Sequence, residues 1–115
     1  MATIQVYSDS VQTQLNTEVT VIEIQGDVGP YSIIEGYIDL SQMPSDGAVI
    51  VREYLGLSGT PVLFLEATID SSIKGRMIRF HSKALPVNGI YKVTVEQTAG
   101  TAFTVNYWFA KTGLT

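Results

Sequence analysis

Hydrophobic and polar residues alternate with a period of two along most of the chain, the pattern of strands with one buried face. The clearest case follows Asn88–Gly89, a strong tight-turn signal. In the segment 89–98, alternate positions place four residues on one face: Tyr91, Val93, Val95 and Gln97. After a turn at 98–101, the segment 103–110 does the same with Phe103, Val105, Tyr107 and Phe109. Aromatic and β-branched residues pair well across strands, so these segments are predicted to form an antiparallel hairpin packed on the core.

Seven further segments show strand patterns between turn-rich breaks. Strands are predicted at 19–24, 32–40, 48–55, 62–69 and, more weakly, 76–81, with edge strands at 4–8 and 11–15. The strand 32–40 is expected to bulge at Gly36. Breaks are predicted at 26–30, 41–47 and 57–60, where Gly, Pro, Asp and Ser cluster. The continuous apolar run 62–65 predicts a fully buried, central strand.

These segments predict an all-β protein with eight or nine strands and no helix. Short strands separated by turns are typical of an antiparallel β-sandwich with jelly-roll or Greek-key connections. An up-and-down barrel is the alternative. The 115 residues match the usual size of one domain, so residues 1–115 are predicted to form a single sandwich domain.

The amino-acid composition argues against several classes of function. Charged residues make up 16% of the chain, so surface polarity must come from Thr, Ser, Gln and Gly, as suits extracellular, viral or assembly proteins. The net charge is −4 and no run of Lys or Arg occurs, so nucleic acid is not an expected partner. The chain has no cysteine, no visible signal peptide and no apolar stretch long enough for a membrane span. Synthesis in a cytoplasm is expected, and no membrane partner.

Few residues of the chain are suited to catalysis or metal binding. His81 is the single histidine, and no nucleophile motif accompanies it. The acidic residues are dispersed rather than clustered as metal sites require. Glu53 and Glu66 could face each other as a glycosidase pair, but cross-strand ion pairs with Arg52, Lys92 or Arg79 are the simpler interpretation. No enzyme activity, cofactor or metal is therefore predicted.

Exposed side chains that could bind a partner are the remaining candidates for a functional site. Trp108 has the opposite parity to Phe103, Tyr107 and Phe109, so it either covers a second core layer or stands exposed as a contact anchor. Trp108, Tyr54 and Arg52 are the candidate interaction surface. Exposed aromatic side chains also suit stacking on sugars, which makes a carbohydrate-binding module the alternative function, with a glycan as ligand.

Four segments carry a resemblance to a known group of proteins: Tyr-Ile-Asp-Leu-Ser at 37–41, the loop Pro-Ser-Asp-Gly at 44–47, the strand 49–54, and 91–100 with its Thr-Ala-Gly end. The chain resembles small β-sandwich structural proteins encoded beside the head genes of tailed phages and related proviruses. The resemblance covers roughly residues 35–110. It implies a non-enzymatic protein of the virion, capsid-associated or of decoration type, made in the host cytoplasm. The expected partners are further copies in a homo-oligomer and a capsid or other virion protein.

Overall fold

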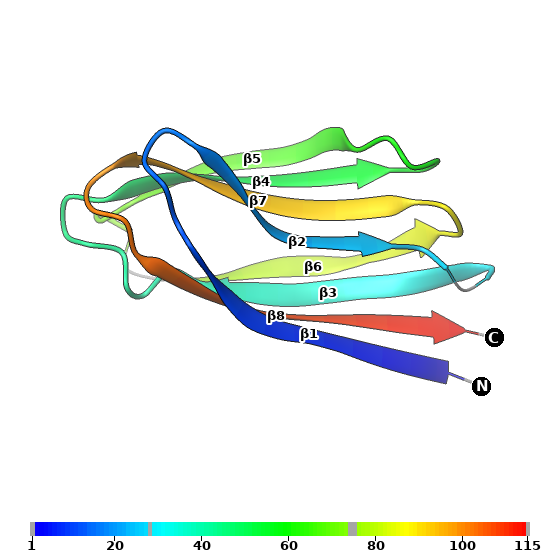
Figure 1. Ribbon diagram of the computed structural model, residues 1–115. Helices are drawn as coiled ribbons and strands as arrows, with labels where there is room; N and C mark the ends of the chain where they lie inside the picture. Colours follow the sequence, from blue (N-terminus) through cyan, green and yellow to red (C-terminus); the bar gives the residue numbers. More distant parts are fainter. Residues whose placement is uncertain (1, 28, 74–75, 115) are drawn as a thin grey trace.

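The computed structural model describes residues 2–27, 29–73 and 76–114, and in this part the chain forms eight strands and no helix (Figure 1). The strands are β1 (Ala2–Gln12), β2 (Glu18–Gln25), β3 (Tyr31–Asp39), β4 (Ala48–Gly56), β5 (Val62–Asp70), β6 (Met77–Pro86), β7 (Ile90–Ala99) and β8 (Thr104–Leu114). Two predicted bounds are wrong. The segment 4–8 and the first two residues of 11–15 belong to one strand, β1, and residues 13–15 lie beyond its end. The segment 77–81 is the first part of the longer β6. Val28, in the predicted break at 26–30, lies outside the described residues.

The strands form two four-stranded sheets with the orders β1-β8-β3-β6 and β2-β7-β4-β5, and all neighbours are antiparallel. Figure 1 shows the sheets stacked as two layers. Among the described strands, only β4 and β5 follow each other within one sheet; every other connection crosses to the opposite sheet. This connectivity is that of a jelly roll. The predicted sandwich is confirmed, and the barrel alternative is wrong.

The predicted hairpin of the last two strands is wrong, although both strands exist. β7 pairs with β2 and β4, whereas β8 pairs with β1 and β3 in the other sheet. Their inward faces are as predicted, with Tyr91 and Phe109 fully buried. The two strands therefore contribute to the core from opposite sides and meet through side chains rather than backbone hydrogen bonds.

The predicted central position of the strand at 62–69 is also wrong. β5 pairs only with β4 and forms an edge of its sheet. The four apolar residues at its start are between 51% and 62% exposed: Val62, Leu63, Phe64 and Leu65. An unbroken apolar run predicts burial on both faces, but here it lies on an edge with neither face covered.

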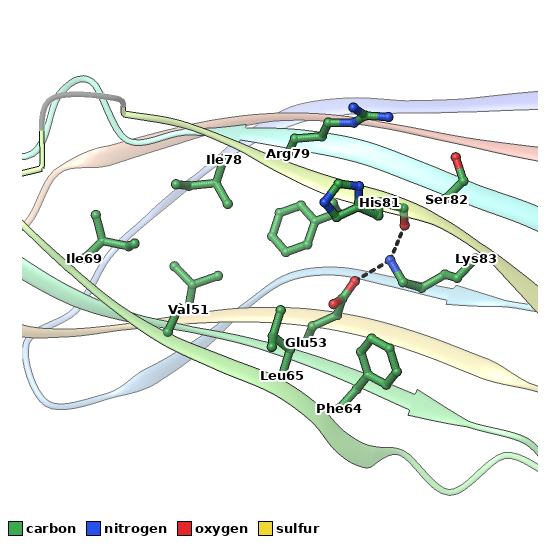
Figure 2. A pocket seen from close by; sticks show the side chains of 12 residues that line it. Val51, Glu53, Phe64, Leu65, Ile69, Ile78, Arg79, His81, Ser82 and Lys83 are labelled. Atoms are coloured by element: carbon green, nitrogen blue, oxygen red, sulfur yellow. Dashed lines mark hydrogen bonds and ion pairs between the residues drawn. The ribbon is translucent and has the colours of Figure 1, made fainter.

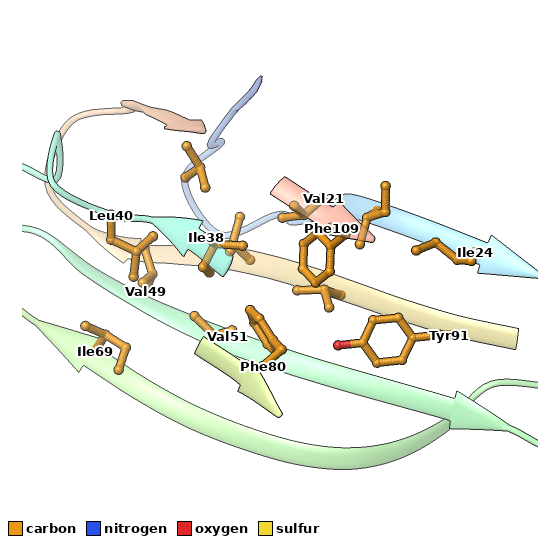
Figure 3. Packing of buried hydrophobic residues seen from close by; sticks show 14 of the residues in the cluster. Val21, Ile24, Ile38, Leu40, Val49, Val51, Ile69, Phe80, Tyr91 and Phe109 are labelled. Carbon is orange, nitrogen blue, oxygen red and sulfur yellow. The ribbon is translucent and has the colours of Figure 1, made fainter. Parts of the chain in front are cut away.

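The core lies between the sheets and is centred on an aromatic cluster (Figure 3). The Phe109 ring packs against Phe80 and Tyr91, with centroid distances of 5.5 and 6.2 Å. Gly36, at the predicted bulge of β3, lies directly opposite Phe109. A Cβ atom at Gly36 would stand 2.2 Å from Phe109 Cδ2, so only glycine leaves room for this ring.

A buried polar contact joins two connections at one end of the sandwich. The fully buried Gln97 donates from Nε2 to the carbonyls of Ala99, at 3.0 Å, and Thr101, at 2.6 Å. Its Oε1 accepts from Thr13 Oγ1 at 2.6 Å, and Thr13 Oγ1 accepts from the Phe103 amide at 2.9 Å. These bonds satisfy buried polar groups and tie the segment after β1 to the segment before β8.

A second buried polar contact lies towards the other end. Lys111 on β8 is 4% exposed, and its Nζ donates to the Gln25 carbonyl at 3.1 Å and to Asp27 Oδ1 at 2.7 Å. The hydrogen bond from Lys111 lowers the pKa of Asp27 below its usual value. The pair therefore joins β8 to the segment after β2 in the opposite sheet.

Candidate functional site

The sandwich is open along the margin where β5 and β6 face each other. A groove of about 310 Å³ lies there between the two sheets, and we name it the β5–β6 groove (Figure 2). Most of its lining is apolar: Val51, Leu65, Ala67, Ile69, Ile78 and Phe80. Because β5 and β6 are both edge strands, no third strand covers this margin in the described part of the chain.

An ion pair stands on the floor of the β5–β6 groove. Lys83 Nζ lies 2.7 Å from Glu53 Oε2, and only 12% and 4% of the two side chains are exposed. Glu53 also accepts a hydrogen bond from the buried Tyr91 hydroxyl at 2.6 Å. Lys83 Nζ donates to the His81 carbonyl and lies 5.2 Å from the Tyr91 ring centroid. Burial raises the pKa of Tyr91, and the Glu53 carboxylate raises it further, so the hydroxyl stays protonated and donates.

The exposed run on β5 borders this groove. Phe64 and Leu65 line it, and Lys83 Nζ lies 6.0 Å from the Phe64 ring centroid. The outer backbone edge of β5 has no strand partner among the described residues. An uncovered apolar edge is where another chain can add a strand or pack side chains.

The glycosidase arrangement is wrong for this fold. Glu53 is buried between the sheets, whereas Glu66 points to the outer face, where Glu66 Oε2 accepts from Arg52 Nε at 2.8 Å. Arg52 and Glu53 are consecutive in β4, so their partners lie on opposite sides of the sheet. The cross-strand ion pair between Arg52 and Glu66 is confirmed as the simpler interpretation.

His81 is exposed on β6 at the rim of the groove. The neighbouring Ser82 hydroxyl donates to Glu35 Oε2 at 2.8 Å. In the residues that the structure describes, no three His, Cys, Asp or Glu side chains gather where they could hold a metal ion. None of these residues belongs to a helix long and apolar enough to cross a membrane.

The outer face of the β2-β7-β4-β5 sheet carries a charged network around Arg52. The guanidinium pairs with Glu66, Glu96 and Glu18 at 2.8, 2.9 and 3.5 Å, and these partners raise its pKa. Burial opposes ionisation of Glu18, but hydrogen bonds from Thr94 and Tyr54, together with Arg52, lower its pKa. The Arg52 guanidinium and the Tyr54 hydroxyl therefore already bind glutamate side chains of their own sheet.

The outer face of the β1-β8-β3-β6 sheet instead carries a pair of exposed aromatic side chains. Trp108 on β8 and Tyr37 on β3 are cross-strand partners, and they are 40% and 43% exposed. We name this pair the aromatic face. The burial alternative for Trp108 is thus wrong. A depression of about 390 Å³ lies on one side of the pair and one of about 280 Å³ on the other.

The three residues of the candidate interaction surface do not come together. Tyr54 and Arg52 lie on one outer face, and Trp108 lies on the other. Sequence reasoning missed Tyr37 and Lys83. The outward parity of Trp108 was a usable signal for its own exposure, but finding Tyr37 beside it requires the register of β3 on β8.

The fold defines the class of this protein as a jelly-roll β-sandwich, and solved structures from infectious bursal disease virus are similar to it. A subviral particle of infectious bursal disease virus VP2 matches with a TM-score of 0.54 at 14% identity, over 97% of this chain and 32% of that chain. The Gt strain of infectious bursal disease virus matches with a TM-score of 0.54 at 12% identity, over 98% of this chain and 33% of that chain. This chain thus spans about a third of those proteins. No protein-family model and no curated protein matches the sequence. At these identities, the likeness shows the fold.

Proposed function

We propose that this chain is a non-enzymatic structural protein of a virus particle, capsid-associated or of decoration type. The observation that carries the proposal is the jelly-roll fold, which is similar to that of VP2 in a subviral particle of infectious bursal disease virus along 97% of this chain. The sequence phrases at 37–41, 49–54 and 91–100 favour a tailed phage or related provirus as the source. The chain would be made in the host cytoplasm and reside in the virion, without nucleic acid or membrane as partner.

The contacts would be made with further copies of the chain and with a capsid or other virion protein. The apolar run of β5 supports this, because side chains from Val62 to Leu65 are more than half exposed beside an unpaired strand edge. Burial of four such side chains at an interface would stabilise it by several kcal/mol, at roughly 1.5–3 kcal/mol for each side chain fully buried. A rigid sandwich with one uncovered apolar edge is suited to assembly.

The test is the solution mass by light scattering, for the chain alone and mixed with the candidate shell protein. We expect an oligomer or a complex with the shell. The double variant Leu63→Ser and Leu65→Ser should weaken that association without unfolding the chain, because both side chains are exposed. Leu57→Ser is the matched control, since Leu57 is 71% exposed in the turn before β5. A monomer that ignores the shell and is absent from particles by mass spectrometry would contradict the proposal.

A further inference from the structure

The aromatic face has polar side chains on both sides of its two rings. In the next cross-strand row, Asp39 on β3 lies opposite Asn106 on β8, and both line the larger depression. The Ser41 amide donates to Asp39 Oδ1 at 2.8 Å, which orients this carboxylate. On the other side, the smaller depression is lined by Arg79 and Glu35. Exposed rings and planar hydrogen-bonding groups therefore alternate along this outer face.

This combination distinguishes a ligand site from a protein contact. Asp and Glu are depleted at protein–protein interfaces, whereas here the Asp39 and Glu35 carboxylates line the two depressions beside the rings. A sugar ring is suited to such a surface. Its weakly positive C–H groups pack on the negative face of an aromatic ring, and its hydroxyls bond to carboxylate, amide and guanidinium groups. Concave, largely apolar sites with a few polar groups are the usual form of small-ligand sites.

We propose that the aromatic face binds a neutral saccharide, with Trp108 and Tyr37 as stacking platforms. Asp39, Asn106 and Arg79 supply the hydrogen bonds. Two carboxylates, Asp39 and Glu35, stand against the single cation Arg79 among these groups, so an uncharged sugar fits better than an acidic one. This binding site is independent of the role in a virus particle proposed above, because it uses the opposite sheet from β5.

The chain contains one tryptophan, so its fluorescence reports on Trp108 alone. Four neutral hexasaccharides serve as probes: the oligomers of α-glucose, β-glucose, mannose and N-acetylglucosamine. We expect at least one to shift the emission in a saturable manner at concentrations up to about 10 mM. Tyr37→Ala, followed by fluorescence, and Trp108→Ala, followed by calorimetry, should each weaken binding at least about tenfold while the circular dichroism stays unchanged.

Tyr31→Ala is the matched control, because Tyr31 is a 38% exposed tyrosine on the same strand that lines neither depression. It should bind as the unmodified chain does. Failure of all four sugars to bind would overturn the proposal, and so would binding of sialyllactose alone. An emission shift that follows protein concentration without sugar, with a doubled solution mass, would make this face a contact between copies instead.

Discussion

Lys83 Nζ and Glu53 Oε2 lie 2.7 Å apart in the β5–β6 groove, and they join β6 of one sheet to β4 of the other. The ion pair is therefore a cross-link at the open margin of the sandwich. Replacing Lys83 with Met leaves the Glu53 carboxylate buried without its counter-ion. We expect Lys83→Met to lower the free energy of unfolding by about 3 kcal/mol, measured by urea denaturation.

A double variant separates the ion pair from packing. Glu53→Gln with Lys83→Met removes both charges and retains an acceptor for the Tyr91 hydroxyl. Because an uncharged pair in an apolar site is often as stable as the ion pair, the double variant should recover most of the lost stability. If the double variant instead loses as much stability as Lys83→Met and Glu53→Gln lose together as single variants, the two charges do not interact.

Gly36 is predicted to tolerate no side chain. In Gly36→Ala, the new Cβ would meet Phe109 Cδ2 at 2.2 Å and the Trp108 carbonyl oxygen at 2.5 Å. We expect the free energy of unfolding, measured by thermal denaturation, to fall by about 3 kcal/mol, or the variant to yield no soluble protein. Gly59→Asn is the comparison: Gly59 has a φ of 97° but an open surrounding, and Asn adopts positive φ more readily than other side chains. Equal losses in both variants would contradict the steric explanation.

Thr13 is predicted to act through its hydroxyl. Thr13→Val keeps the shape but leaves Gln97 Oε1 and the Phe103 amide without their partner. Such buried, unsatisfied groups cost about 1–3 kcal/mol each, so urea denaturation should show a loss of about 2 kcal/mol. Thr13→Ser retains the hydroxyl and should lose less. A neutral Thr13→Val variant would show that the hydroxyl is not needed.

The contact between Asp27 and Lys111 predicts a pH dependence. The pKa of Asp27 is lowered in the folded chain, so its contribution to stability is present above the ordinary value of 3.8. That contribution is lost as the pH falls through the folded pKa. The unmodified chain should therefore melt at a higher temperature than Asp27→Asn at pH 7, and this difference should shrink as the pH falls below 3.8. A difference of constant size down to acid pH would contradict a role of the carboxylate charge.

Local periodicity predicted which side chains point inward, but not which strands pair. The faces of β7 and β8 follow from alternation alone, because successive residues of a strand point to opposite sides. Their pairing does not, because a short connection can close a hairpin or cross between sheets. The short connection around Gly100 crosses between the sheets, and this is why the predicted hairpin is wrong.

The candidate site was less predictable, because it depends on contacts between distant segments. An apolar run such as 62–65 looks the same in a central strand and on an exposed edge, and only the sheet order separates the two. The Lys83–Glu53 pair joins residues of different sheets. The exposure of Trp108, by contrast, was one of two alternatives that its parity left open.

The pairing of the first strand with the last bears on how the chain folds during synthesis. β1 pairs with β8 from Ala2 opposite Leu114 to Gln12 opposite Thr104. On a ribosome, β1 emerges before β8 and has no partner in this sheet until β8 has also left the exit tunnel. The β1-β8-β3-β6 sheet can therefore close only after residues 104–114 of β8 have emerged. Until then, the apolar side chains of β1 stay unpaired in the nascent chain, where a chaperone can hold them.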